Sequence, residues 1–295
     1  MPLLNTLSFV VNHPLNRNQP LRAGWDFLRW QLNTRLNPYP VVYPFGARSK
    51  LLVAKGMTGA TGNIYCGLHE FADMGFLLHF LRPDDFFIDV GANIGSYTIL
   101  AASEVGARVL SFEPIPLTYA HLQQNIKINQ LEPLVTAHNL GLGAAAGSLS
   151  FTKGLDTMNH VDPTASPGSL SVPIQTLDAL TTLSTPTLLK IDVEGFEMAV
   201  LQGMPQTLAS PSLKAIIIEI NGAGQRYGFN ENELDALLQS HAFRPFAYNP
   251  FPRSLTALAP KSRAKAPNTI YLRELEWAAE RLRLAPYRKI HRQVF

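Results

Sequence analysis

The chain of 295 residues contains a single cysteine, Cys66. One cysteine cannot form an intrachain disulfide, so we expect a protein of a reducing compartment. Long apolar runs are missing too, because none approaches the ~18 consecutive apolar residues of a membrane-spanning helix. The N-terminal stretch MPLLNTLSFVVNHP lacks the basic start and the unbroken apolar run of a signal peptide. These absences predict a cytoplasmic protein with no transmembrane segment.

The charge is unevenly distributed, although the net charge is only +3. Residues 1–60 carry +6, residues 61–250 carry −10 and residues 251–295 carry +7. The basic ends either pack on the acidic middle, which we favour, or meet phosphate or a membrane surface. No nucleic-acid partner is expected from this pattern.

Two nucleotide-binding motifs are missing as well. The phosphate-binding loop G-x-x-x-x-G-K-[ST] does not occur, and Asn93 and Ser96 stand where G-x-G-x-x-G needs its second and third glycines. The same segment, FFIDVGANIGSYTILAA, nevertheless predicts a buried strand at Phe86–Val90, a glycine turn, and a helix from Ser96 to Val105. Glycines let backbone approach a ligand, and a helix N-terminus offers unpaired N–H donors. The unit therefore predicts a nucleotide cradle.

An acid at the end of the next predicted strand narrows the choice of cofactor. Glu113 follows Asp89 by 24 residues and is placed to accept hydrogen bonds from both hydroxyls of a ribose. The alternative for Glu113 is a strand-end acid that caps the following turn. A cofactor with a ribose but no diphosphate fits best, which favours S-adenosylmethionine. An NAD-dependent oxidoreductase is the weaker alternative.

Strands and helices alternate through most of the chain. The predicted strands lie in FFIDV, ARVLSFEP, LVTAHNLGLG, TPTLLKIDVEG, LKAIIIEIN, FRPFAYN and PNTIYLR. Alternation predicts an α/β fold with a mostly parallel sheet and helices on both faces. The last two strands lack an intervening helix, so one of them is expected to be antiparallel at the sheet edge. Residues 152–173 and 249–267 are predicted to be loops.

Five segments taken together resemble a known family. FIDVGANIGSYTILAA, VLSFEPIPLTYAHLQQNIKIN, VPIQTLDAL, LLKIDVEGFEMAVLQGM and IIIEIN occur in the order seen in the FkbM-type S-adenosylmethionine-dependent methyltransferases. The resemblance implies a class I methyltransferase (Rossmann-like) fold with a seven-stranded sheet whose last strand is antiparallel. It also implies O-methylation of a hydroxyl on a sugar, glycoside or other small natural product. We expect the methyltransferase domain at 61–272, an N-terminal extension at 1–60 and a basic helix and tail at 273–295.

The resemblance also implies which residues surround the cofactor. The glycine turn would enclose its methionine and ribose parts, Glu113 would accept the ribose hydroxyls, and adenine would lie near Pro114 and the turn after the third strand. Glu70 either approaches the cofactor's amino group or is a solvated helix residue. The full predicted set is Glu70, Asp89, Gly91, Asn93, Gly95, Ser96, Glu113, Pro114, Asn139, Leu140 and Gly141.

Asp192 and Glu194 are the candidate catalytic residues, at the end of the fourth predicted strand. In-line methyl transfer depends on alignment, and a hydroxyl acceptor must also lose its proton to a general base or a metal-bound group. Strand alternation directs both acids, with Lys190, to one side of the sheet if the strand extends that far. The alternative is a Lys–acid network that only orders the loop.

A metal is the less favoured way to activate the hydroxyl. Asp192, Glu219 and Asn221 offer the oxygen ligands that Mg²⁺ prefers, but no ligand spacing in the sequence supports such a site. His160 is a further candidate base, whereas His69 and His138 are expected to have no chemical role.

Two other functions stay open on the sequence. A catalytically inactive methyltransferase-fold binding protein would keep the same glycine turn. A nucleic-acid methyltransferase is disfavoured, because DVEG replaces the Asn/Asp-Pro-Pro-aromatic motif of base-methylating enzymes. The oligomeric state is not indicated, and a homodimer is one option.

Overall fold

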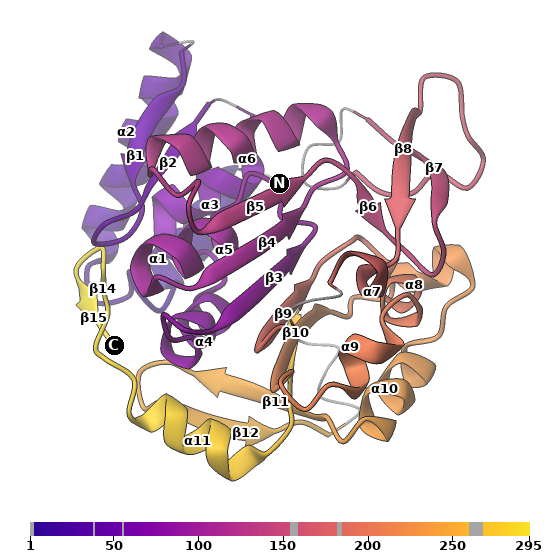
Figure 1. The fold of residues 1–295 in the computed structure, drawn as a ribbon. Helices are drawn as coiled ribbons and strands as arrows, with labels where there is room; N and C mark the ends of the chain where they lie inside the picture. Colours follow the sequence, from indigo (N-terminus) through magenta and orange to yellow (C-terminus); the bar gives the residue numbers. More distant parts are fainter. Residues whose placement is uncertain (1–2, 38, 55, 154–158, 182–184, 260–267) are drawn as a thin grey trace.

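The computed structural model describes residues 3–37, 39–54, 56–153, 159–181, 185–259 and 268–295. Its centre is a single large sheet (Figure 1). In order across the sheet, the eight strands are β12 (Ser254–Ala257), β11 (Arg244–Asn249), β13 (Asn268–Leu272), β10 (Ala215–Glu219), β9 (Leu188–Ile191), β3 (Phe86–Val90), β4 (Arg108–Phe112) and β5 (Val135–His138).

Strand directions confirm the predicted fold class. Strands β10, β9, β3, β4 and β5 are parallel, whereas β13 runs antiparallel to both β10 and β11. The last predicted strand, β13, is antiparallel as expected, but its predicted place at the edge is wrong, because β13 inserts between β10 and β11. The edge strand is β12, which forms within a stretch predicted to be a loop and pairs antiparallel with β11.

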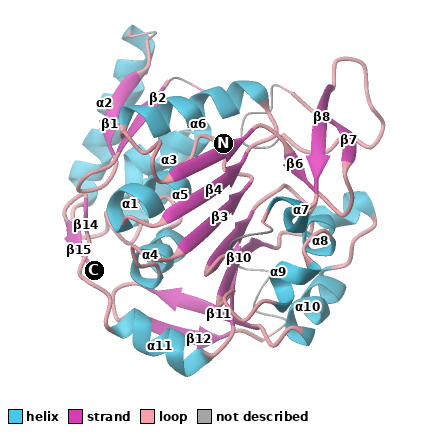
Figure 2. Ribbon diagram, viewed as in Figure 1, coloured by secondary structure: helices cyan, strands magenta, loops and turns pink. Residues whose placement is uncertain are grey.

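Helices cover both faces of the sheet (Figures 1 and 2). On one face, the helices that share a hydrophobic core with the strands are α1 (Leu3–Asn12), α2 (Pro20–Leu36), α3 (Thr58–Cys66), α4 (Phe71–Phe80), α5 (Ser96–Ile99), the π-helix η1 (Leu100–Val105), α6 (Pro116–Ile128) and α11 (Leu275–Arg283). On the other face they are α7 (Leu177–Leu180), α8 (Glu197–Gln202), α9 (Pro205–Ala209) and α10 (Glu231–Ser240). Successive residues of a strand point to opposite faces of the sheet. In β3, Phe87 packs into the core on the first face, and Ile88 and Val90 pack into the core on the second face.

The N-terminal segment packs onto the first core. It contains an antiparallel hairpin of β1 (Val41–Pro44) and β2 (Lys50–Val53). The buried carboxylate of Glu104 in η1 accepts hydrogen bonds from the backbone N–H groups of Arg48 and Ser49, at 2.9 and 2.8 Å. The turn of the hairpin is therefore tied to the helix that follows the glycine turn.

A second, three-stranded sheet stands beside the carboxyl ends of the central strands. It contains β6 (Gly141–Leu142), β8 (Leu170–Gln175) and β7 (Gly147–Phe151), and most of the loop predicted at 152–173 connects β7 to β8. The predicted third strand is thus two strands, β5 and β6, separated by a turn. The 3₁₀ helix η3 (Ala223–Tyr227) follows β10, and a hairpin of β14 (Lys289–Ile290) and β15 (Gln293–Val294) ends the chain. Across the described ranges, no helix combines the length and apolar character needed to cross a membrane.

Candidate active site

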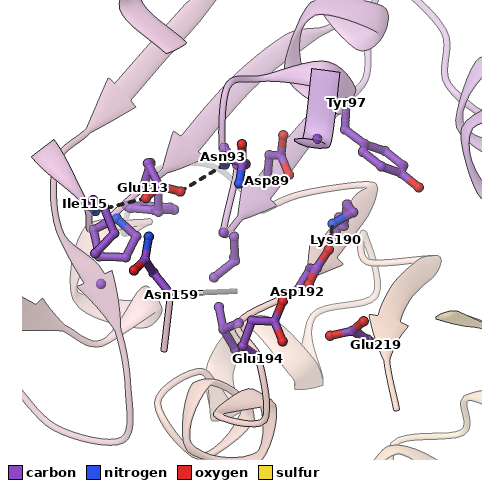
Figure 3. A pocket seen from close by; sticks show the side chains of 18 of the residues that line it. Asp89, Asn93, Tyr97, Glu113, Ile115, Asn159, Lys190, Asp192, Glu194 and Glu219 are labelled. Carbon is purple, nitrogen blue, oxygen red and sulfur yellow. Dashed lines mark hydrogen bonds and ion pairs between the residues drawn. The ribbon is translucent and has the colours of Figure 1, made fainter. Parts of the chain in front are cut away.

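A cavity of about 380 Å³ lies at the carboxyl ends of β3, β4, β9 and β10. Ligands of open α/β sheets bind at this end of the strands, where the strand order reverses. The reversal falls between β3 and β9 here, since β4 and β5 extend the sheet to one side of β3 and β9 and β10 to the other. The cavity brings together the glycine turn, Glu113, the two acids that follow β9, and the acid that ends β10 (Figure 3).

The glycine turn is shaped by close contact with the loop after β9. Gly91 has a φ of +78°, and a Cβ atom there would lie 1.8 Å from the backbone oxygen of Asp192. Only glycine allows both this backbone conformation and this approach. Gly95, with φ of +94°, is the residue before α5 and does not line the cavity. Ser96 does line it, and its hydroxyl accepts a hydrogen bond from Asn63 at 3.0 Å.

The buried carboxylate of Asp89 uses only one of its two oxygens in hydrogen bonds to the described residues. Its Oδ2 accepts hydrogen bonds from the N–H and the hydroxyl of Thr98, at 3.1 and 2.7 Å. Its Oδ1 is buried and has no hydrogen-bond partner among the described residues. Burial raises the pKa of Asp89, partly offset by the charge of Lys190. A buried acceptor without a partner is costly, so Oδ1 marks a position where a ligand can donate a hydrogen bond.

Glu113 is held by backbone N–H groups on both of its oxygens (Figure 3). Asn93 N–H donates to Oε2 and Ile115 N–H donates to Oε1, each at 2.9 Å. Burial raises the pKa of Glu113 to about 7, and these two donors oppose the rise. The Asn139 side chain donates to the backbone oxygens of Glu113 and Pro114 at 2.8 and 3.0 Å, so it supports this loop from outside the lining.

The remaining wall residues of the predicted cofactor set are Glu70, Pro114, Leu140 and Gly141, and all of them line the cavity. Glu70 precedes α4 and is not a solvated helix residue. Its Oε2 accepts a hydrogen bond from the Tyr97 hydroxyl at 2.8 Å, and its Oε1 accepts one from Asn268 at 2.9 Å. Glu70 therefore joins the glycine-turn side of the cavity to β13.

The two acids that follow β9 and the acid that ends β10 gather at another end of the cavity. One carboxylate oxygen from each of Asp192, Glu194 and Glu219 lies within 4.8 Å of the other two. Burial and the neighbouring negative charge of Asp192 raise the pKa of Glu194 to about 7. The pKa of Glu219 is raised for the same reasons, and its Oε2 is buried without a hydrogen-bond partner among the described residues.

Lys190 is the cation beside these acids. Its Nζ donates to Oδ2 of Asp192 at 2.7 Å and lies 4.7 Å from the centre of the Tyr97 ring. Burial alone would lower the pKa of Lys190, but the charges of Asp192, Glu70 and Asp89 outweigh burial and raise it. A buried lysine with three carboxylates around it stays protonated and neutralises part of their charge.

Asp192 and Glu194 both line the cavity, but not because they alternate along a strand as predicted. Strand β9 ends at Ile191, and the chain turns through Glu194 at φ of +54° and Gly195 at φ of +100°. One of the three predicted metal ligands, Asn221, is not at the site. Its side chain is exposed, does not line the cavity, and accepts a hydrogen bond from Ala223 N–H. Glu194 takes its place beside Asp192 and Glu219.

Sequence reasoning missed several lining residues, among them Asn63, Tyr97, Phe151, Asn159 and Phe196. Tyr97 and Phe196 lie within segments that carry the family resemblance, whereas the other three belong to no recognisable motif. His69 lines the cavity, whereas His160 and His138 do not. His138 stacks on Phe112 with ring centres 5.6 Å apart.

A family model described as "Methyltransferase FkbM domain" matches residues 89–245, from the end of β3 into β11. The chain belongs to this family. Among curated relatives, a hexuronic acid methyltransferase of Haloferax volcanii is 32% identical over 148 residues, which cover 49% of this chain and 59% of that protein. A 31-O-demethyl-FK506 methyltransferase of Streptomyces tacrolimicus is 28% identical over 209 residues, covering 59% of this chain and 78% of the relative.

The match to the archaeal relative spans somewhat more than half of that protein's length. Among solved structures, an FkbM methyltransferase of Methylobacillus flagellatus KT superposes with a TM-score of 0.46 at 15% identity, covering 72% of this chain and 52% of that one. The FkbM match includes Asp89, Glu113 and Asp192, and Glu70 lies outside it.

Proposed function

We propose that this FkbM-family protein is an S-adenosylmethionine-dependent O-methyltransferase whose acceptor is a hydroxyl of a sugar, glycoside or other small natural product. One observation carries the proposal: a group of three carboxylates and a buried lysine shares a single cavity with the glycine turn and Glu113. The hexuronic acid methyltransferase among the relatives supports a sugar acceptor.

The residues present fit S-adenosylmethionine. Asp89 offers a buried acceptor oxygen that has no partner among the described residues, and Gly91 allows the turn beside it to approach the backbone of the loop after β9. Each oxygen of Glu113 accepts one N–H, and a carboxylate oxygen can accept a second hydrogen bond, here from a ribose hydroxyl. When bound, the cofactor would supply a methyl group activated on a positively charged sulfur.

The acidic end of the cavity would orient the acceptor and take its proton. Asp192 is fixed by the ion pair with Lys190, so its second oxygen can accept a hydrogen bond from the acceptor hydroxyl. Glu194 has a pKa of about 7 and can therefore accept a proton near neutral pH. Fixing the acceptor beside the donor removes much of the entropic cost of an in-line displacement.

A divalent cation held by Asp192, Glu194 and Glu219 is the second way to lower the pKa of the hydroxyl. Three carboxylate oxygens within 4.8 Å of one another are a hard-oxygen set that suits Mg²⁺. The general-base mechanism and the metal mechanism use the same acids. Only the metal mechanism should be stopped by a chelator.

The test is release of S-adenosylhomocysteine with a panel of neutral sugars, hexuronic acids and their glycosides, with EDTA and with added Mg²⁺. We expect turnover with at least one hydroxyl acceptor. Turnover that survives EDTA identifies a general base, and turnover that EDTA stops and Mg²⁺ restores identifies a metal.

Calorimetry with S-adenosylmethionine and with NAD separates the other candidate functions. Failure to bind S-adenosylmethionine would refute the proposal. Binding of S-adenosylmethionine without turnover on any acceptor would favour the inactive binding protein, and binding of NAD instead would favour an oxidoreductase.

A further inference from the structure

Helix α2 carries two apolar faces, and only one of them is buried. Ala23, Phe27 and Trp30 pack into the core that the extension shares with the sheet. The opposite face presents Leu21, Trp25, Leu28, Leu32 and Leu36, which are between 49% and 91% exposed. We call these five residues the α2 stripe. At about 100° per residue they fall within an arc of about 80°, and the helix is about 25 Å long.

The α2 stripe is bordered by arginines on both sides. Arg22 and Arg29 lie along one border, Arg35 lies along the other, and all three are exposed. The only acid among residues 1–60 is Asp26, which pairs with Arg292 of the C-terminal hairpin at 3.3 Å. That hairpin also presents the exposed Lys289, so a second basic segment lies beside α2 (Figure 1).

We propose that the α2 stripe and its flanking arginines dock this protein on the surface of a membrane that contains anionic phospholipids. An exposed line of leucines with a tryptophan, flanked by arginines, has the composition of a helix that lies in the plane of the interface. The leucines enter the boundary between headgroups and acyl chains, Trp25 lies at headgroup level, and the arginines pair with lipid phosphates.

Charge disfavours a second copy of the chain as the occupant. A two-fold symmetric contact through the α2 stripe would place the arginines of both copies around the same apolar line. No acid of residues 1–60 remains to compensate them, because Asp26 is paired with Arg292. Like charges facing each other across an interface are unfavourable, whereas the phosphates of an anionic bilayer complement them.

The test is co-sedimentation of the full-length protein with vesicles of phosphatidylcholine alone and of phosphatidylcholine with 30% phosphatidylglycerol. We expect binding to the anionic vesicles that falls at least ten-fold on neutral vesicles. The double variant Leu28→Ser/Leu32→Ser and the double variant Arg22→Glu/Arg29→Glu should each lower binding to anionic vesicles at least ten-fold. The substitutions are on exposed positions, and an unchanged thermal midpoint confirms that each variant is folded.

Two exposed leucines on other helices provide the matched control, Leu117→Ser on α6 with Leu275→Ser on α11. This variant should bind as the wild type does. Binding that the α2 variants leave unchanged would overturn the proposal. Failure of the wild type to bind either kind of vesicle would also overturn the proposal. If the wild type is in that case a dimer, and Leu28→Ser/Leu32→Ser converts it to a monomer, the α2 stripe is a contact between copies of the chain. The inference is independent of methyl transfer, since vesicle binding is measured without cofactor or acceptor.

Discussion

The two ends of the cavity hold carboxylates in opposite ways. Glu113 is buried, and each of its oxygens accepts a backbone N–H, so the main chain fixes its position. Asp192, Glu194 and Glu219 are only partly buried, repel one another, and depend on the side chain of Lys190. The first arrangement suits a cofactor that always has the same shape. The second arrangement suits a site that gains or loses a proton, or binds and releases a ligand, during the reaction.

The difference predicts that substitutions at the two ends have different kinetic effects. A change at the Glu113 end should weaken cofactor binding and leave the maximal rate almost intact. A change at the Asp192 end should lower the maximal rate and leave cofactor affinity almost intact.

The largest effect is expected for Asp192→Asn. The uncharged amide no longer pairs as an anion with Lys190 and holds the acceptor hydroxyl less firmly beside Glu194, so kcat should fall about 10²–10³-fold. The dissociation constant for S-adenosylmethionine, measured by calorimetry, should change less than about three-fold (about 0.6 kcal/mol). Asp84→Asn, an exposed aspartate just before the other end of β3, is the control. Unchanged turnover in Asp192→Asn would remove this residue from the mechanism.

The second effect is expected for Glu113→Ala. Loss of hydrogen bonds to a charged acceptor costs about 1.5–3 kcal/mol, so cofactor affinity should fall about 10–100-fold. At saturating cofactor, kcat should stay within about three-fold of the wild type. Glu113→Gln keeps one acceptor oxygen and should lose less affinity than Glu113→Ala. A normal dissociation constant in Glu113→Ala would show that this acid only caps its turn.

The Glu113 end was largely predictable from sequence, and the physical reason is local. The apolar run of Phe86–Val90 and the glycine pattern after it dictate a strand and a turn, and β3 has the predicted bounds. Gly91 connects this local pattern to the tertiary structure. The left-handed conformation that requires glycine also brings Gly91 into van der Waals contact with the loop after β9.

The acidic end was predictable only in part. The sequence placed Asp192 and Glu219 at strand ends but could not show that a left-handed turn brings Glu194 to them, or that Asn221 turns away. Strand order was equally out of reach: β13 lies inside the sheet because of pairing between distant segments, for which chain order gives no rule. Tyr97 and Asn63 reach the cavity through tertiary packing alone.

Lys190→Met should sharpen the contrast with an effect of about ten-fold on kcat. Without the ammonium group the three carboxylates keep their repulsion uncompensated, so their pKa values rise and the acidic limb of the pH–rate profile moves to higher pH. A merely structural role would lower stability without moving the profile. Lys214→Met, at a more exposed ion pair with Glu274, is the matched control. A profile that does not move in Lys190→Met would contradict the role of Lys190 as a positioning residue.

The smallest effect concerns stability against pH. Burial and Asp192 raise the pKa of Glu194 in the folded protein from 4.5 to about 7, so between these values the folded state binds a proton that the unfolded state has released. The Glu194 contribution to the free energy of unfolding therefore declines as pH rises from about 4.5 to 7. Two buried histidines, His13 and His79, act oppositely, because their pKa values are lowered to about 4 and their contribution grows as pH rises.

Comparison with Glu194→Gln isolates the Glu194 contribution from the histidines, which are the same in both proteins. Between pH 5 and pH 8 the wild type should lose about 1 kcal/mol more than the variant, equivalent to about 2–4 °C in Tm; this is less than the full pKa shift implies, because solvent screens a partly buried acid. Denaturant unfolding at both pH values, with the exposed Glu132→Gln as control, measures the difference. Equal losses in wild type and Glu194→Gln would mean that solvent screens this acid from Asp192, and the acidic end would then resemble an ordinary surface rather than a charged site held against repulsion.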